Sequence, residues 1–173
     1  MHVMANKLGA LGVLLTDALD DALDGVSASA AALLLTLHHR PGLTATELAR
    51  VAGIAQPTAA RVLDGLVRRG WLRRQPRAGR TTPLLVTPAG QEQARSLQAA
   101  RLHAMDRLLA GLTEPDRATF ERLLDTVLAA TTTSRAQARS TCRLCDHAAC
   151  DGPLCPIGTR ATELERATST PER

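Results

Sequence analysis

The sequence predicts a mainly α-helical protein with one small two-stranded sheet, and three observations support this fold class. Hydrophobic residues make up 45% of the 173 residues, yet the aromatic residues are only Trp71 and Phe120. The core therefore has to be built from Leu, Val and Ala, which favours packed helices. Leucines recur at helical spacing along much of the chain, and only residues 71–88 read as a pair of strands.

The length fits one globular domain of ordinary size with appendages. No stretch reaches the roughly 18 apolar residues of a membrane span, because Asp and Arg interrupt each apolar run. The N-terminus also lacks the basic start and apolar core of a secretory signal. We therefore expect a cytoplasmic protein with no membrane partner.

The first two helices are expected over residues 6–24 and 28–39. Ser27 can cap the second helix, and the Pro41-Gly42 pair stops it. The first helix carries one apolar face, formed by leucines at positions 8, 11, 15, 19 and 23.

A short third helix and a longer fourth helix follow. Thr44 and Glu47 have the spacing of a capping box, which opens the third helix, and Gly53 ends it. After a three-residue turn, Pro57 suits the first turn of the fourth helix, and Gly70 closes that helix.

The fourth helix divides into two faces by residue spacing. Its apolar stripe consists of Val62, Leu63, Leu66 and Val67, whereas Thr58, Arg61, Gly65 and Arg68 follow one another on the opposite face. A short helix, a tight glycine turn and a second helix with a polar outer face form the layout of a helix-turn-helix, whose second helix lies in a DNA major groove.

The segment after the fourth helix reads as a β-wing. Residues 71–76 and 81–88 are the two strands, and the basic stretch 77–80 is the hairpin tip. Pro83 makes the second strand an edge strand or delays its start. Two long helices follow, over about 88–111 and from Thr113 or Glu114 to 130, and the first of them is expected to bury Leu97, Leu102, Met105 and Leu109.

Positive charge is concentrated in one short segment. Residues 61–80 hold seven arginines against one aspartate, a net charge of +6, although the whole chain carries only +4. A basic surface of this kind suits a polyanion, because displacing counterions from a phosphate backbone drives binding. An arginine-rich surface that simply faces solvent remains the alternative.

The succession of three helices, wing and two long helices resembles the MarR family of winged-helix transcription regulators. The segments TATELARVAGIAQPTAARVLDGLVRRGWLRR and LLVTPAGQEQA carry the resemblance, which covers roughly residues 6–131. It implies a winged helix-turn-helix with long N- and C-terminal dimerisation helices. It also implies a homodimer with two recognition helices about one DNA turn apart, and often a pocket for a small-molecule effector, here unknown.

The resemblance assigns the DNA-contacting positions. Gln56, Pro57 and Thr58 start the recognition helix, and Gln56 and Thr58 can bond base edges or phosphate. Arg61, one turn on, can reach guanine or phosphate, and Arg68 extends the same face. The wing arginines, Arg77 and Arg80, fit the minor groove or its backbone, although Ala78 stands where the family usually places an Asp.

All four cysteines of the chain lie in CRLCDHAACDGPLC, at positions 142, 145, 150 and 155. In a reducing compartment such a cluster indicates metal binding more often than disulfides. Four thiolates this close can surround one zinc ion, with a spacing similar to that of a zinc knuckle. The ending Cys155-Pro156 also resembles iron–sulfur ligation. A thiol–disulfide switch is the third alternative.

These patterns predict four parts of the chain. Residues 1–131 form the DNA-binding and dimerisation domain, 132–141 a linker, 142–156 the metal-binding module and 157–173 a partly disordered tail. We expect a DNA-binding transcriptional regulator, most simply a repressor, whose metal centre stabilises it or senses redox state. A protein- or RNA-binding scaffold of the same fold is the competing class. An enzyme is not expected, since no nucleophile–base set, carboxylate pair or phosphate loop is present.

Overall fold

The computed structural model describes residues 2–76, 82–150 and 152–169, and these ranges are mostly helical with one two-stranded sheet. The mainly helical fold with a two-stranded wing is thus confirmed. No helix in these ranges is both long and apolar enough to cross a membrane. The elements are α1 (His2–Ala22), α2 (Ala28–His39), α3 (Ala45–Ala52), α4 (Gln56–Arg68), β1 (Leu72–Arg74), β2 (Leu84–Val86), α5 (Pro88–Leu108), α6 (Glu114–Thr131), α7 (Arg135–Thr141), the 3-10 helix η1 (Gly152–Leu154) and α8 (Pro156–Ser169).

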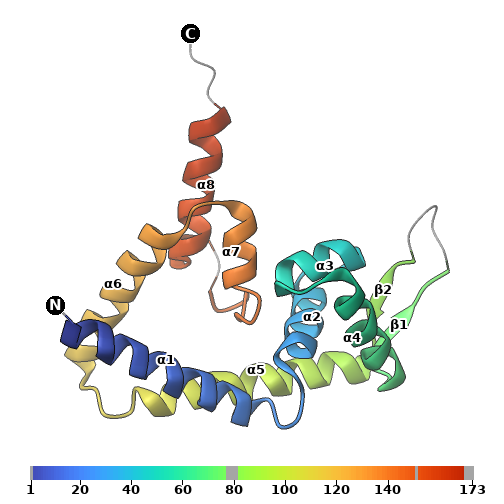
Figure 1. Cartoon of the computed structure of the whole chain (residues 1–173), viewed down its shortest axis with the longest axis horizontal. Helices are drawn as coiled ribbons and strands as arrows, with labels where there is room; N and C mark the ends of the chain where they lie inside the picture. The colour runs from blue at the N-terminus through green and yellow to red at the C-terminus, as the bar shows by residue number, and fades with distance from the viewer. Residues whose placement is uncertain (1, 77–81, 151, 170–173) are drawn as a thin grey trace.

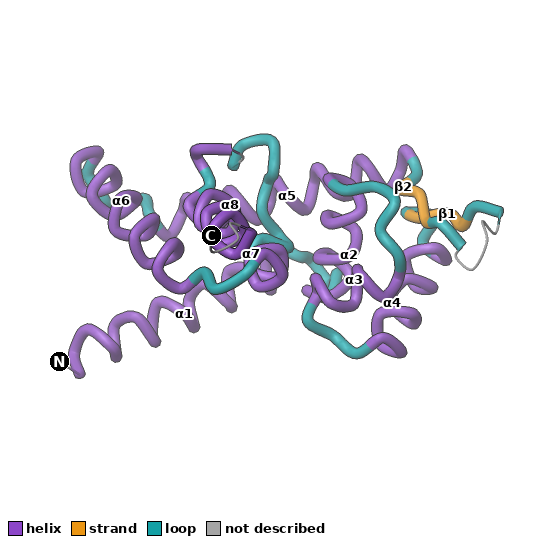
Figure 2. The backbone as a smooth tube through the Cα atoms, turned by 90° about the horizontal axis from the view of Figure 1, so that it is seen from above, coloured by secondary structure: helices purple, strands orange, loops and turns teal. Residues whose placement is uncertain are grey.

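Helix α5 connects the parts of the molecule. One end of α5 contacts α2 and β2, which belong to a compact unit formed by α2, α3, α4 and the sheet (Figure 1). We call this unit, residues 28–86, the winged lobe. Helix α1 packs along α5 away from the lobe, and the view from above places the N-terminus and the wing at opposite ends of the molecule (Figure 2).

The helix starts follow the predicted local signals. The Ser27 hydroxyl accepts a hydrogen bond from the Ala30 amide at 3.2 Å, as an N-cap does. Thr44 and Glu47 form the predicted capping box at the start of α3. Gly53 ends α3 with φ of +67°, a left-handed conformation that glycine adopts without strain.

Helix α2 is the centre of the main core. Eight of its twelve residues are buried, because α3, α4 and α5 all pack around it. The side chains of Leu33 and Leu34 are fully enclosed. A helix that is apolar on every side is stable only in such surroundings, so α2 depends on its neighbours as much as they depend on it.

One predicted core position is wrong. Leu97 is buried as expected, but Leu102 on the same helix is 38% exposed, and Met105 and Leu109 are only partly buried. The physical reason is that the lobe core reaches α5 at Ala94 and Leu97 and does not extend to Leu102. Helical spacing identifies the apolar face of a helix, but it does not show how far the covering layer extends.

The C-terminal region is more ordered than the sequence indicated. Residues 132–141, expected as a linker, form α7 over most of their length, and the expected tail forms α8. Ser134 caps α7 by accepting the Gln137 amide at 3.1 Å. Ala138 of α7 packs with Ile157 and Ala161 of α8 in a small second core. Such short apolar contacts give no clear periodicity, so the helices were not predicted. Residues 170–173 lie outside the described residues.

Candidate functional site

Helix α4 presents the residues predicted to contact nucleic acid. It buries Ala59, Leu63 and Leu66 against the lobe core, which turns the opposite face outward. Gln56, Pro57, Thr58, Arg61 and Arg68 are all exposed on the described surface, as the spacing indicated.

The start of α4 is oriented by α3. The Gln56 side-chain amide donates a hydrogen bond to the Thr46 hydroxyl at 3.1 Å. Further along the helix, a Cβ atom added at Gly65 would meet only the end of the flexible Arg68 side chain, at 3.8 Å. The outer face of α4 therefore has no side chain at Gly65, near its middle, and has polar or basic side chains toward both ends. A face of this shape can enter a groove.

The wing is joined to α4 by short-range contacts. Its strands are antiparallel, with Leu72 opposite Val86. Arg74 on β1 makes an ion pair with Asp64 on α4. The Trp71 amide also donates to the Leu66 carbonyl at 3.0 Å, so the strand that carries the wing lies directly beside the helix that carries Arg61.

A second set of contacts ties the base of the wing to α5. The Thr87 hydroxyl donates to the Gly70 carbonyl at 2.6 Å and accepts from the Gly90 amide at 3.0 Å. A Cβ atom at Gly90 would lie 2.0 Å from the Trp71 carbonyl oxygen, so this position requires glycine. The end of α4, the base of the wing and the start of α5 thus meet at one point.

The wing tip, residues 77–81, lies outside the described residues. The predicted contacts of Arg77 and Arg80 therefore stay predictions. Within the described part, Arg73 is exposed on β1 and was not singled out from the sequence. The sequence did contain a signal for this exposure. Successive side chains of a strand point to opposite faces, so Arg73 faces away from the buried Leu72. Arg69 lies over the Trp71 ring at 5.0 Å, a cation–π contact that occupies part of its guanidinium.

Comparison with known proteins agrees with this geometry. A model of the MarR family matches residues 24–80. The HTH-type transcriptional repressor Rv2887 of Mycobacterium tuberculosis is 34% identical over 94 residues, covering 53% of this chain and 68% of that protein. The chain belongs to the MarR family. Members of the family found in these comparisons are transcriptional regulators, which confirms that the chain is not an enzyme.

Solved structures extend the match. The crystal structure of Rv2887 in complex with DNA has a TM-score of 0.61 and 28% identity, and the match covers 71% of this chain and 95% of that one. Rv2887 in complex with p-aminosalicylic acid gives a TM-score of 0.59 and 30% identity, covering 71% and 96%. YusO of Bacillus subtilis, at 20% identity and a TM-score of 0.65, covers 73% and 93% and shares the fold.

The four cysteines lie well beyond residue 80, where the match to the MarR-family model ends. Cys142 ends α7, and Cys155 directly precedes α8. Between them, the Cys145 amide donates to the Cys142 carbonyl at 3.0 Å, and the Cys150 amide to the Asp146 carbonyl at 2.9 Å. We call residues 142–155 the cysteine loop, and α7, this loop and α8 together the cysteine module.

The four thiols all line one open cavity of about 580 Å³, which also extends along α7 and α8. Each cysteine is half-buried. A hydrogen bond from Cys142 to Cys145 raises the pKa of Cys142 and lowers that of Cys145 to about 6. Burial raises the pKa of Cys150 to about 11, and the nearby Cys155 adds to the shift. In the described ranges, however, no three His, Cys, Asp or Glu side chains converge on a point that could hold a metal ion.

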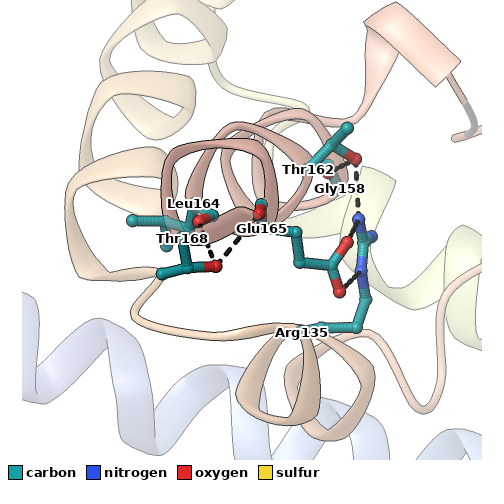
Figure 3. A network of polar contacts seen from close by, with 6 residues as sticks. All are labelled: Arg135, Gly158, Thr162, Leu164, Glu165 and Thr168. Carbon is teal, nitrogen blue, oxygen red and sulfur yellow. Dashed lines mark hydrogen bonds and ion pairs between the residues drawn. The ribbon is translucent and has the colours of Figure 1, made fainter. Parts of the chain in front are cut away.

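Arginine side chains surround the same cavity. Arg40 reaches it from the end of α2, and Arg135 and Arg139 reach it from α7. Arg135 also joins α7 to α8: its guanidinium donates to both carboxylate oxygens of Glu165, at 3.1 and 2.8 Å, and to the Thr162 hydroxyl at 2.7 Å (Figure 3). These hydrogen bonds raise the pKa of Arg135 and lower that of Glu165.

A smaller cavity of about 400 Å³ lies where the cysteine loop meets α2 and α5. His39 from α2 and Gln98 from α5 line it, together with Asp146 and Ala148 from the loop. Burial and the neighbouring His147 lower the pKa of His39. The cavity therefore has a wall that belongs to the cysteine loop.

Proposed function

We propose that the chain is a sequence-specific DNA-binding repressor that acts as a homodimer, with α4 in the major groove and the wing beside it. The exposed polar and basic face of α4, with the wing packed beside it, is the observation that carries this proposal. The repressor Rv2887, to which the chain is similar, has been crystallised with DNA. A basic reading helix with an attached wing is the arrangement that winged-helix proteins use on duplex DNA.

Helices α1 and α6 support the proposed dimer. Neither α1 nor α6 has a buried residue in the single chain, although both are long. Isolated amphipathic helices in water are marginal, and large exposed apolar patches mark interaction sites. A second copy of the chain would cover this surface, which includes Val3, Met4, Leu8, Val13 and Leu14 of α1 and Leu123, Leu124 and Val127 of α6.

The cysteines add a metal centre to this proposal. Cys142, Cys145, Cys150 and Cys155 supply four thiolates to one cavity, the donor set that zinc or an iron–sulfur cluster prefers. The loop that carries them contributes to both of the cavities described above, so a metal held there would influence the shape of both. A thiol–disulfide switch would use the same residues without metal.

The smaller cavity is where we place a small-molecule effector. The related Rv2887 has been crystallised with p-aminosalicylic acid and with salicylic acid. In this chain His39, Arg95 and Gln98 offer polar groups to such a ligand, beside the apolar Leu102. The effector itself is not identified by these residues.

DNA binding is tested with a short duplex selected from a random pool by the wild-type protein. Arg61→Ala removes a cation from each recognition helix and is expected to weaken binding by about 1–3 kcal/mol per contact. Fluorescence anisotropy at several salt concentrations measures both the affinity and its salt slope, which should be steep for the wild type.

Arg117→Ala is the matched control, because Arg117 lies on α6, and its guanidinium donates to the Leu109 carbonyl. The proposal predicts unchanged DNA affinity for this variant. Equal affinity of Arg61→Ala and the wild type, with little dependence on salt, would instead support a scaffold that binds protein or RNA.

A further inference from the structure

We infer that Thr46 of α3 is a positioning residue for base recognition. It holds the Gln56 side-chain amide in one orientation, so that Gln56 selects adenine rather than guanine at the base pair it contacts. This role rests on the DNA-binding function proposed above, and it deepens that function by naming a source of sequence preference.

The Gln56 side chain is held from outside its own helix. Its amide nitrogen donates a hydrogen bond to the Thr46 hydroxyl at 3.1 Å, and both residues are exposed at the surface of the winged lobe. Gln56 is the first residue of α4, and Thr46 is the second residue of α3. The N-terminal residues of a recognition helix are the ones that reach base edges. The hydrogen bond therefore acts on a side chain at the position where bases are read.

The backbone on both sides of this hydrogen bond is fixed. The capping box of Thr44 and Glu47 closes the first turn of α3, in which Thr46 lies. On α4, Ala59 is fully buried against the lobe core, less than one turn after Gln56. Two elements that cannot shift easily thus carry the donor and the acceptor, and only the torsions of the side chains remain to be set.

The hydrogen bond determines which polar groups Gln56 offers to a base. A glutamine amide has two N–H donors and one carbonyl oxygen, and rotation about its last side-chain bond exchanges the positions of the two ends. With one N–H bound to Thr46, one N–H and the carbonyl oxygen are left.

This remaining pair of groups matches adenine. In the major groove adenine presents a donor, its 6-amino group, beside an acceptor, N7, whereas guanine presents two acceptors, O6 and N7. The held amide can accept from the 6-amino group of adenine and donate to N7. Against guanine, the carbonyl oxygen of Gln56 would face O6, and two acceptors without a donor would be buried together.

The direction of the hydrogen bond is maintained on DNA. A hydroxyl can donate as well as accept, so the orientation of the Gln56 amide depends on where the Thr46 hydrogen goes. The first helix of a helix-turn-helix crosses the DNA backbone, where threonine hydroxyls donate to phosphate oxygens. A hydroxyl that donates its one hydrogen to phosphate can only accept from Gln56. The amide nitrogen therefore stays turned toward α3.

The positioning role is tested on full-length protein with the duplex selected from a random pool. Gln56→Ala first identifies the base pair that Gln56 contacts, since the sequence preference should disappear at that position. In the proposed homodimer this base pair occurs once in each half of the duplex, so both copies are changed together. Duplexes that carry A·T or G·C there, in both strand orientations, are then compared by fluorescence anisotropy.

The wild type should prefer adenine over guanine on the same strand by at least about fivefold, the lower end of the discrimination that a good bidentate contact gives. Thr46→Val keeps the shape of the side chain but removes the hydroxyl. It should reduce this preference by at least about twofold, because the amide then has to be ordered on binding and can also turn its N–H groups toward guanine. Thr46→Ser keeps the hydroxyl and should retain the preference.

Thr168→Val is the matched control, because Thr168 lies on α8, where its hydroxyl donates to the Leu164 carbonyl at 3.2 Å. This variant should bind both duplexes as the wild type does. Urea unfolding of Thr46→Val should also match the wild type, since Thr46 is exposed. A purely structural role of Thr46 would instead weaken binding to the adenine and guanine duplexes by the same factor.

The outcomes separate the role of Thr46 from the proposed function. An unchanged ratio of adenine to guanine affinity in Thr46→Val would overturn that role and leave DNA binding intact. So would a wild type that binds guanine as well as adenine, or a Gln56→Ala variant that changes no base preference. A protein that enriches no duplex from the pool and is indifferent to Arg61→Ala would overturn the repressor function, and the role of Thr46 with it.

Discussion

The winged lobe and the cysteine module differ in what holds them together. Seventeen buried residues form the continuous core around the lobe, whereas the core of the module consists of Ala138, Ile157 and Ala161. Stability from apolar burial rises with the size of the core, and very small units need metals, cross-links or docking to stay folded. The difference indicates that the lobe is held by a large apolar core, whereas the module depends on its contacts with the lobe.

The polar contacts within the module do not replace a core. Arg135, Thr162 and Glu165 form its main polar network, and the Glu165 side chain is about half exposed. Ion pairs at such exposed positions contribute only about 0–1 kcal/mol. The metal centre proposed above would be a far larger source of order.

The largest effect is expected from Leu34→Ala in the lobe core. Leu34 is fully buried, so truncation loses apolar contacts and leaves a cavity, at a cost of about 2–5 kcal/mol. Denaturant unfolding of the full-length protein measures this change. Leu154→Ala is the matched truncation in the module, where the side chain is 74% exposed, and we expect less than about 0.5 kcal/mol. Similar losses for both variants would break the comparison.

Gly90→Ala should come next, at about 1–3 kcal/mol. The added Cβ atom would meet the Trp71 carbonyl oxygen, which is part of the backbone at the wing base and cannot move away cheaply. Gly111→Ala is the control, because the space around Gly111 is open. Thermal unfolding compares the two, and anisotropy shows whether DNA affinity falls with the displaced wing. A Gly90→Ala variant as stable as the control would contradict the close packing at this point.

Thr44→Ala removes the capping box of α3 and is expected to cost about 1 kcal/mol. The hydroxyl of Thr44 accepts the Glu47 amide at 3.3 Å, and the Glu47 carboxylate accepts the Thr44 amide at 2.8 Å. These bonds also lower the pKa of Glu47. Thr44→Ser keeps the hydroxyl and should recover most of the loss in urea unfolding. If serine failed to restore stability, the cap would not be the source of the effect.

The smallest effect is expected from Arg135→Ala, at about 0.2–1 kcal/mol. It should appear only in the module, as faster amide exchange in α7 and α8, with no change in the lobe. Arg135→Lys retains the charge but not the paired hydrogen bonds, so it should recover part of the protection. Faster exchange spread over the lobe as well would show that the two regions unfold together.

The fold of the winged lobe was predictable because its signals are local. Ser27, the Thr44–Glu47 pair and Gly53 each act on backbone groups within a few residues, and each lies where the sequence placed it. The exposed face of α4 follows from helical spacing alone. The described part of the predicted DNA surface could therefore be found without coordinates.

The contacts of the cysteine module were not predictable in the same way. Packing of Leu144 on the lobe core and stacking of His147 on His39 join residues far apart in the chain. Helices α7 and α8 have few apolar residues and so give no periodic pattern. The exposure of Leu102 likewise depends on where a neighbouring helix ends, which spacing does not encode.

The junction at Thr87 has a mechanical consequence. The Thr87 hydroxyl contacts Gly70, just beyond the end of α4, and the first turn of α5, and Gly90 packs directly against Trp71 at the base of β1. A rotation of α5 about its axis would therefore move α4 and the wing with it. In the proposed homodimer, a small rotation of α5 at the end where it packs on α1 would then change the distance between the two α4 helices.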